Sequence, residues 1–283
     1  MEIIKKIAWN LLGTKIYIKL KHWWNLGYWP TIDNPTTYNE KTHHRKVNSR
    51  DKTIVKCADK YEVREYVKER LSKKYLVGLI DVKNKIDKAD ICGYPKSFVL
   101  KPNNRSGGVR IIKNKNLINR TDIKYLNKLV SKKYGYRKGE WWYSEIKPRI
   151  VVEKLVESED GGLPDGYKVY CFNSGKKTKQ IIRLIRDRDT DKKDAFFDEK
   201  WKRLNIKYNE NKKIRGEVEK PKNLPEIKKV AKKLSEGFSH VRVDLLQGVH
   251  NLYFCEMTFA DASGFVRFEP ELWDKRFGEL WNM

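Results

Sequence analysis

Charged side chains alternate with apolar ones along two segments near the C-terminal end of the sequence. In HVRVDLL, Arg242 and Asp244 alternate with valines, and in NLYFCEMTF, Glu256 and Thr258 are likewise two residues apart. Because successive side chains of a strand point to opposite faces, pairing of the two strands would bring these four side chains to one face. Two carboxylates that face substrate phosphates suit Mg²⁺, and Arg242 would hold a phosphate oxygen. The alternative is a cross-strand ion pair on a solvated sheet face.

A glycine-rich segment follows an earlier apolar stretch. FVLKPNNRSGG puts Lys101 at the end of a predicted strand and Ser106, Gly107 and Gly108 in a loop. The backbone N–H groups of glycines can approach phosphate oxygens closely, and a lysine beside them neutralises charge. A second predicted strand, VRIIKN, follows, whereas the common phosphate-binding loop lies between a strand and a helix. A plain hairpin turn is the alternative interpretation.

Two further segments carry polar groups at the ends of predicted strands. RIVVEKLVE is an apolar run that ends in charged residues, as at the end of a strand. In a nucleotide site, the backbone groups at Lys154 and Val156 would bond the edge of the adenine, and a carboxylate would bond the ribose hydroxyls. Lys168, in DGYKVYCF, lies on the next strand and would reach phosphate. A charged strand end and a solvated surface lysine are the alternatives.

The elements that must position these groups form two successive β-rich regions. The apolar pattern predicts a helix at 51–71, strands at 97–102, 109–114 and 149–156, and a helix at 122–133 between the last two. Strands at 167–172, 179–187, 240–247 and 251–259 follow, with a long loop at 189–204 and a helix at 226–238. This order predicts an α+β protein with two sheets.

The net charge is strongly positive. The 283 residues include 62 Lys and Arg against 37 Asp and Glu, a formal charge of +25. Such an excess attracts polyanions, among them nucleic acid, anionic lipid, nucleotide phosphates and acidic polysaccharide. The aromatic segments WWY and YGY could stack on single-stranded nucleic acid, but no RNA- or DNA-binding motif accompanies them. We therefore do not expect nucleic acid as the partner.

The cysteines and the first 30 residues bear on localisation. The four cysteines are scattered without metal-ligand spacing, which favours the reducing cytoplasm, and no segment reaches the roughly 20 apolar residues of a spanning helix. Ile3, Ile7 and Leu11 recur at helical spacing among lysines, with Trp23 and Trp24 after them. This pattern predicts a helix that packs on the protein, which we favour, or one that lies on the anionic inner face of a membrane.

None of these signals is specific alone, but their linear order resembles that of ATP-grasp ligases. More closely, the chain resembles the TupA-like ATP-grasp family, whose members are similar to the teichuronopeptide biosynthesis protein and are associated with bacterial surface polysaccharide loci. The resemblance runs from Tyr38 to Phe268, in the segments YNEKTHHRKV, ADKYEVREYV, FVLKPNNRSGG, VVEKLVE, YKVYCFNSGK, HVRVDLL and EMTFADASGF.

The resemblance implies a fold of two α+β lobes that hold ATP between them. A helical N-terminal region would occupy residues 1–90, the small lobe with its glycine lid 91–157, and the large lobe with the metal site 158–283. The implied cofactors are ATP and Mg²⁺. The ADKYEVR segment, with Asp59, Lys60 and Arg64, matches the family, but the resemblance gives it no role.

The resemblance also implies a role for each residue of the motifs. Lys101 would contact ATP, and Ser106, Gly107 and Gly108 would form the lid over the phosphates. Adenine and ribose would be held by the hinge, which comprises Glu153, Lys154, Leu155, Val156 and, for the ribose, Glu157. The catalytic residues Lys168 and Arg242 would meet the phosphates, and the metal ligands would be Asp244, Glu256 and Thr258, the last in place of a common Asn.

The implied reaction joins a carboxylate to an amine through an acylphosphate. The ADASG loop, with Ser263 and Gly264, is our candidate for binding the acyl group, assisted by Arg183 or Arg186. The positive charge suggests an acidic glycan acceptor, or its lipid-linked precursor, in the synthesis of capsule, O-antigen or a teichuronopeptide-type polymer, with an amino acid or another amine as the second substrate. A sugar kinase, a basic nucleic-acid-binding protein and a membrane-associated scaffold are the alternatives.

Overall fold

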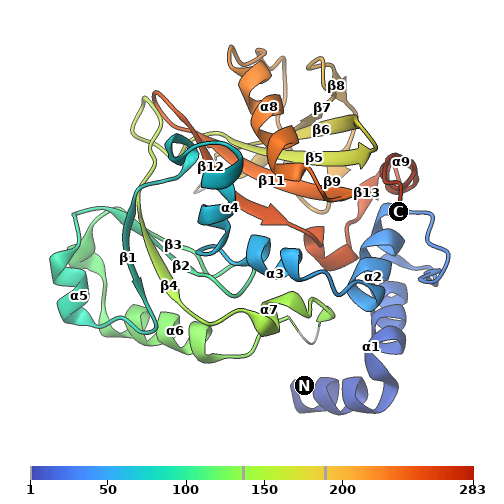
Figure 1. Ribbon diagram of the computed structural model, residues 1–283, viewed down its shortest axis with the longest axis horizontal. Coiled ribbons are helices and arrows are strands. Elements are labelled where there is room, and N and C mark those ends of the chain that lie inside the picture. Colours follow the sequence, from blue (N-terminus) through green and yellow to red (C-terminus); the bar gives the residue numbers. More distant parts are fainter. Residues whose placement is uncertain (1, 136–137, 188–189) are drawn as a thin grey trace.

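The computed structural model describes residues 2–135, 138–187 and 190–283, and only the backbone of residues 2–12. Two mainly antiparallel sheets dominate this part of the chain (Figure 1), and a central cavity lies between them. A third sheet pairs two short strands, β9 (Lys207–Tyr208) and β13 (Phe268–Glu269). The two sheets predicted from the sequence are therefore present, with a small third sheet in addition.

The small sheet has the strand order β1-β4-β2-β3. Its strands are β1 (Leu79–Lys83), β2 (Phe98–Pro102), β3 (Arg110–Ile112) and β4 (Ile150–Lys154). Phe98 and Leu100 alternate away from the cavity and lie in one buried cluster with residues of α6 (Arg120–Ser131) and α5 (Lys88–Gly93). The predicted hairpin is confirmed, because β2 and β3 pair with Val99 opposite Ile111. The division at residue 90 stays a prediction, and β1, which lies before it, pairs with β4.

The large sheet has the order β10-β7-β6-β5-β11-β12, with β8 paired to β7. Its strands are β5 (Gly166–Ser174), β6 (Lys177–Arg186), β7 (Lys193–Phe197), β8 (Arg203–Leu204), β10 (Lys212–Lys213), β11 (His240–Gln247) and β12 (Leu252–Thr258). The prediction of a loop at 189–204 was wrong, because β7 and β8 lie there. Ala195, Phe196 and Phe197 are buried, although charged residues surround them in the sequence.

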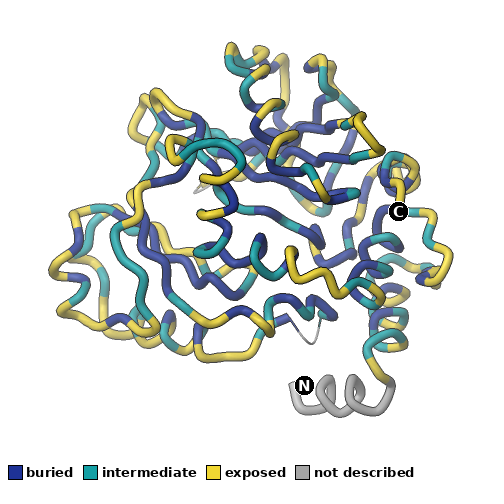
Figure 2. Tube along the Cα trace, viewed as in Figure 1, coloured by how far each residue is buried: buried dark blue, intermediate teal, exposed yellow. Residues whose placement is uncertain are grey.

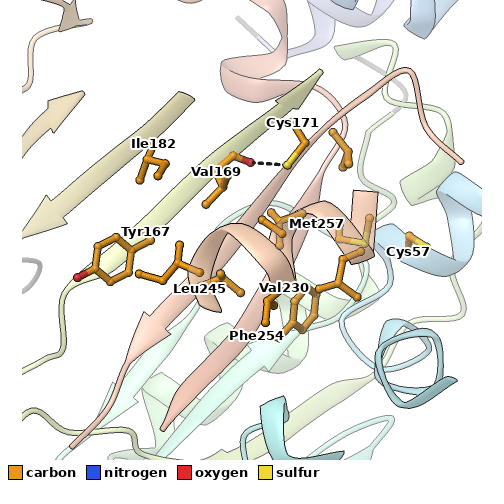
Figure 3. Close-up of a cluster of buried hydrophobic side chains, with 14 of the residues drawn as sticks. Cys57, Tyr167, Val169, Cys171, Ile182, Val230, Leu245, Phe254 and Met257 are labelled. Atoms are coloured by element: carbon orange, nitrogen blue, oxygen red, sulfur yellow. Dashed lines mark hydrogen bonds between the residues drawn. The ribbon is translucent and has the colours of Figure 1, made fainter. Parts of the chain in front are cut away.

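The two faces of the large sheet differ in chemistry, as period-two alternation requires. One face packs Val169, Leu245 and Met257 against α8 (Leu224–Ser235), and Figure 3 shows this cluster. Cys171 also lies in it, where burial raises the pKa of its thiol to about 11, in keeping with a small apolar residue. Buried segments follow the strands of both sheets (Figure 2).

The other face of the large sheet carries polar residues at one end and aromatic residues at the other. The aromatic end, with Tyr170 and Phe172, is covered by α2 (Tyr38–Asn48) and α9 (Leu272–Leu280). Tyr38 of α2 bonds His240 of β11 through its hydroxyl at 3.1 Å. The helices thereby cover the aromatic end and leave the charged end of this face toward the small sheet.

The N-terminal helices differ from the single helix predicted at 51–71. Two helices lie there, α3 (Lys52–Ala58) and α4 (Val63–Arg70). Asp59 ends the first, and its carboxylate accepts bonds from the backbone N–H groups of Tyr61 and Glu62. The remaining elements are α1 (Glu2–Leu26), which bends at Gly13, α7 (Trp142–Glu145), and the short 3₁₀ helices η1 (Lys73–Tyr75), η2 (Lys115–Leu117) and η4 (Asp261–Gly264).

None of the helices in the described ranges has the length and apolar character that a membrane span requires.

Candidate active site

A cavity of about 320 Å³ lies between the two sheets. Its walls combine apolar side chains with a few charged groups, which is typical of a small-molecule site. The small sheet contributes Val99 and Lys101 of β2 and Ile111 of β3, and the large sheet contributes Lys168, Asp244 and Glu256. The segment between the sheets supplies Lys154, Leu155 and Val156, so three of the predicted hinge residues line the cavity.

The acidic pair comes together as the alternation predicted. Asp244 of β11 lies directly opposite Glu256 of β12, and Arg242 lies opposite Thr258. Lys168 is the partner of Asp244 on the other side, with 3.0 Å between its Nζ and Oδ2 of Asp244. Burial alone would raise the pKa of Asp244, but Arg242 and Lys168 outweigh it and lower the pKa. Asp244 is therefore held ionised at the cavity wall.

Arg242 lies behind these carboxylates and is buried. It donates from Nε and Nη2 to the two oxygens of Asp244, at 2.6 and 2.8 Å, and from Nη1 to Asp261. Nη2 also donates to Thr258 at 3.0 Å and lies 3.5 Å from Glu256. Neither Arg242 nor Thr258 is among the described residues that line the cavity. The geometry makes Arg242 the support of the acidic pair, whereas the sequence predicted a direct phosphate contact.

A second buried ion-pair set supports the small-sheet lysine. Glu153 of β4 bonds Lys101, and it also accepts from Nη1 of Arg64 at 2.6 Å. Burial would lower the pKa of Lys101, but the Glu153 carboxylate raises it above its usual value. Glu153, predicted to hold adenine, does not line the cavity and instead fixes the lysine that does.

Lys60 is a cavity residue to which the sequence gave no role. It follows the end of α3, and its Nζ lies 3.6 Å from Oε2 of Glu256 and donates to the carbonyl of Arg105 at 2.7 Å. Asp59 beside it accepts from Asn103 Nδ2 at 2.9 Å. The ADKYEVR segment thus joins the acidic pair to the glycine loop and, through Arg64, to Glu153. Its match to the family motif was the signal that singled it out.

The glycine loop lies over one edge of the cavity. Gly107 lines it, and both Gly107 and Gly108 have positive φ angles, of 76° and 78°. A Cβ at Gly108 would come within 3.0 Å of Leu129 and 3.2 Å of Pro102, so a larger residue would displace the loop. Ser106 and Glu157 are exposed and lie outside the cavity lining.

The ADASG loop forms η4 and lies on the far side of Arg242. Asp261 accepts from Arg242 and, at 2.6 Å, from the hydroxyl of Tyr170. Ala262 and Ser263 both have positive φ angles, a strain of roughly 1 kcal/mol or more per residue that surrounding contacts must balance. Ser263 and Gly264 are buried and do not line the cavity, and Asp261 of the same loop bonds Arg242 behind the acidic pair.

The two candidate arginines of β6 lie on opposite faces of the large sheet. Arg183 lies beside Lys168 in the strand register, but it is buried and donates from Nε to Asp194 at 2.9 Å. Arg186 points to the other face and donates to Asp165 at 3.0 Å. The structure brings neither side chain into the cavity lining.

In the part of the chain that the structure describes, no group of three or more His, Cys, Asp and Glu side chains could hold a metal. The candidate metal ligands are thus the pair Asp244 and Glu256, which requires further oxygens from a substrate.

Comparison with known proteins assigns the family. The model of the TupA-like ATPgrasp family matches residues 40–282. The chain belongs to this family. Its fold is therefore the ATP-grasp fold, and the α+β prediction is confirmed. No curated protein matches the chain.

Among solved structures, this TupA-like chain is similar to several ligases and synthetases. D-alanine–D-alanine ligase from Helicobacter pylori is 13% identical, with 81% of this chain and 61% of that chain covered and a TM-score of 0.47. The Bacillus anthracis D-alanine–D-alanine ligase complexed with ATP is 17% identical, with 80% and 65% covered and a TM-score of 0.39. N5-carboxyaminoimidazole ribonucleotide synthetase from Thermotoga maritima is 13% identical, with 78% and 44% covered and a TM-score of 0.36. The chain thus spans less than two thirds of each of these proteins.

Proposed function

We propose that this chain is an ATP-dependent carboxylate–amine ligase. The observation that carries the proposal is the cavity between the sheets, whose lining combines Asp244 and Glu256 with four lysines and Gly107 of the glycine loop. Membership of the TupA-like ATPgrasp family supports the same reaction class. The nucleotide would lie with its base against Val99, Ile111 and the hinge and with its phosphates toward the lysines.

The charged residues fit the demands of phosphoryl transfer, which needs position and charge neutralisation more than a covalent nucleophile. Asp244 and Glu256 would hold Mg²⁺, which neutralises charge on the ATP phosphates. Lys60, Lys101 and Lys168 would meet the phosphate oxygens as three separately anchored cations. The glycine loop would exclude water from an acylphosphate that hydrolyses readily.

The reaction then has two steps. A carboxylate oxygen of the substrate attacks the γ-phosphorus, the bond to the β-phosphate oxygen breaks, and ADP leaves. The amine nitrogen next attacks the acyl carbon, inorganic phosphate leaves, and the nitrogen loses a proton to give the amide. The amine and the carboxylate would enter the same water-excluded cavity.

The acceptor in this proposal is an acidic surface glycan, such as one with uronic acids, or its lipid-linked precursor. The formal charge of +25 supports a polyanionic partner, because it raises the local concentration of acidic polymers. The product would be a capsule, O-antigen or teichuronopeptide-type polysaccharide that carries an amide-linked amino acid or amine. Synthesis would take place in the cytoplasm.

The nucleotide site is tested by thermal stabilisation with MgATP. A ligand at roughly 100 times its Kd stabilises a protein by about 2.7 kcal/mol, so the unfolding midpoint should rise measurably. We expect Asp244→Asn and Glu256→Gln to remove this rise, while Glu159→Gln, an exposed acid elsewhere, retains it. A full rise in both cavity variants would contradict the proposal.

The reaction class is tested with hydroxylamine, which traps acylphosphates as hydroxamates. The protein is incubated with MgATP, hexuronic acid oligosaccharides and hydroxylamine, and the products are analysed by mass spectrometry. A ligase gives hydroxamate, ADP and free phosphate. Phosphate bound to the sugar as a phosphoester would identify a kinase instead and overturn the ligase assignment.

A further inference from the structure

The outer side of α1 carries apolar side chains that the protein does not cover. Ile16, Leu20, Trp23 and Trp24 recur at helical spacing and are 49%, 40%, 51% and 81% exposed, and Trp29 after the helix is 53% exposed. We call these five residues the tryptophan stripe. At 100° per residue, the four on the helix lie opposite the side on which Ile18 and His22 are buried. The helix therefore presents one apolar side to the protein and a second to solvent.

Among the tryptophans whose side chains the structure describes, exposure is confined to this stripe. The other tryptophans placed there, at 141, 142, 201, 273 and 281, are buried or half-buried. A large aromatic ring that leaves its apolar area in water forgoes the favourable burial it could have elsewhere. Three exposed rings within seven residues form a patch of the kind that marks an interaction surface.

The charge around the tryptophan stripe indicates which kind of surface it would bind. Residues 3–32 contain five lysines, at positions 5, 6, 15, 19 and 21, and neither Asp nor Glu. Helical geometry puts Lys19 and Lys21 on either side of the stripe. The Nζ of Lys21 lies 4.9 Å from the centre of the Phe265 ring, and Lys15 contacts Asp33 at 2.6 Å. Apolar and indole side chains flanked by lysines match a bilayer surface, where rings enter the headgroup region and ammonium groups remain in water beside anionic headgroups.

We propose that the tryptophan stripe of α1 binds the surface of an anionic lipid bilayer. The chain would lie at the membrane by this helix, with the stripe in the headgroup region. Part of the binding comes from electrostatic attraction between the lysines and the anionic headgroups, and salt screens this part. The surface is separate from the nucleotide cavity, so the inference goes beyond the ligase proposal and does not depend on it.

The test is sedimentation of the full chain with vesicles of phosphatidylcholine alone or mixed with phosphatidylglycerol. We expect binding to the mixed vesicles, weaker binding in high salt, and at least about a tenfold loss of affinity in Trp23→Ser/Trp24→Ser. Lys19→Gln should weaken binding by less. Leu117→Ser, which removes a 77% exposed apolar side chain far along the chain, is the matched control and should bind as the unaltered protein does.

Each other outcome overturns the inference. The inference is wrong if the unaltered chain remains in the supernatant with anionic vesicles, or if Leu117→Ser loses as much affinity as the double variant. A change of oligomeric state in the double variant, with unchanged lipid binding, would identify a second copy of the chain as the partner of the stripe. Thermal unfolding checks that each variant is folded, and Lys19→Gln tests the electrostatic part if the double variant does not fold.

Discussion

At the scale of single residues, Arg242 links the acidic pair to the ADASG loop. Its donors are committed to Asp244, Asp261 and Thr258, so it positions the carboxylates that line the cavity. Arg242→Lys retains one charge but loses the bidentate contact, and breaking a buried pair costs about 3 kcal/mol or more. We expect lower stability in denaturant and a higher Mg²⁺ concentration for half-maximal nucleotide binding.

The matched control for Arg242 lies on the same sheet face. Arg183 is also buried, but it bonds a single carboxylate, that of Asp194, and neither Arg183 nor Asp194 lines the cavity. Arg183→Lys should lower stability to a similar extent and leave the Mg²⁺ requirement unchanged. If Arg242→Lys binds nucleotide with the Mg²⁺ dependence of the unaltered protein, the positioning role is wrong.

The residues of the acidic pair could be predicted because a strand has a strict period. That period decides which side chains share a face, so Arg242, Asp244, Glu256 and Thr258 followed from spacing alone. The period does not decide how deeply a side chain is buried or which residues it bonds. The burial of Arg242 depends on Asp261, and that of Glu153 on Arg64, residues 19 and 89 positions away. Lys60 was missed as a site residue for the same reason.

At the scale of elements, α1 and α2 are joined by a pair of buried histidines. Nδ1 of His22 lies 2.9 Å from Nε2 of His43. Burial lowers the pKa of His22 from 6.5 to about 4 and also lowers that of His43. Between pH 6.5 and pH 4, His22 is protonated in the unfolded chain and neutral in the folded protein. The free energy of unfolding therefore falls as the pH drops from 6.5 toward 4. For His22 alone, linkage gives about 2 kcal/mol between pH 7.5 and pH 5.

This dependence is measured as the free energy of unfolding at the two pH values. His22→Asn retains a donor near the position of Nδ1 but does not titrate, so its stability should fall less on acidification. His250→Asn is the control, because His250 is exposed. An unchanged pH profile in His22→Asn would show that the histidine junction does not control acid stability.

Element boundaries were less predictable than element types. The apolar pattern of residues 51–71 is helical throughout, yet the chain turns at Asp59, whose carboxylate bonds Tyr61 and Glu62 N–H groups in place of a continued helix. In 189–204 the apolar run is only three residues long, so alternation could not reveal β7. Pairing with β6, which places Phe196 opposite Arg183, makes this segment a strand.

At the scale of the whole molecule, positive charge gathers along a groove on the outer side of the small sheet. It has a volume of about 1000 Å³ and lies between α6 and the segment before α5. Its described lining has one acid, Asp87, and five cations, which are Lys85, Lys88, Arg120, Lys124 and Lys128. The three on α6 are spaced four residues apart, where like charges destabilise a helix by about 0.2–0.5 kcal/mol per pair.

This groove offers a track for the acidic polymer of the ligase proposal. Removing its α6 charges by Arg120→Gln/Lys124→Gln/Lys128→Gln should weaken binding of polygalacturonate by about tenfold at low salt and reduce the salt dependence of the remaining affinity. Helix stability should rise slightly, so a folding defect is not expected. Lys229→Gln/Lys232→Gln/Lys233→Gln removes the same net charge from the exposed side of α8 and is the matched control. Equal losses in the two triple variants would mean that total charge, and not the groove, attracts the polymer.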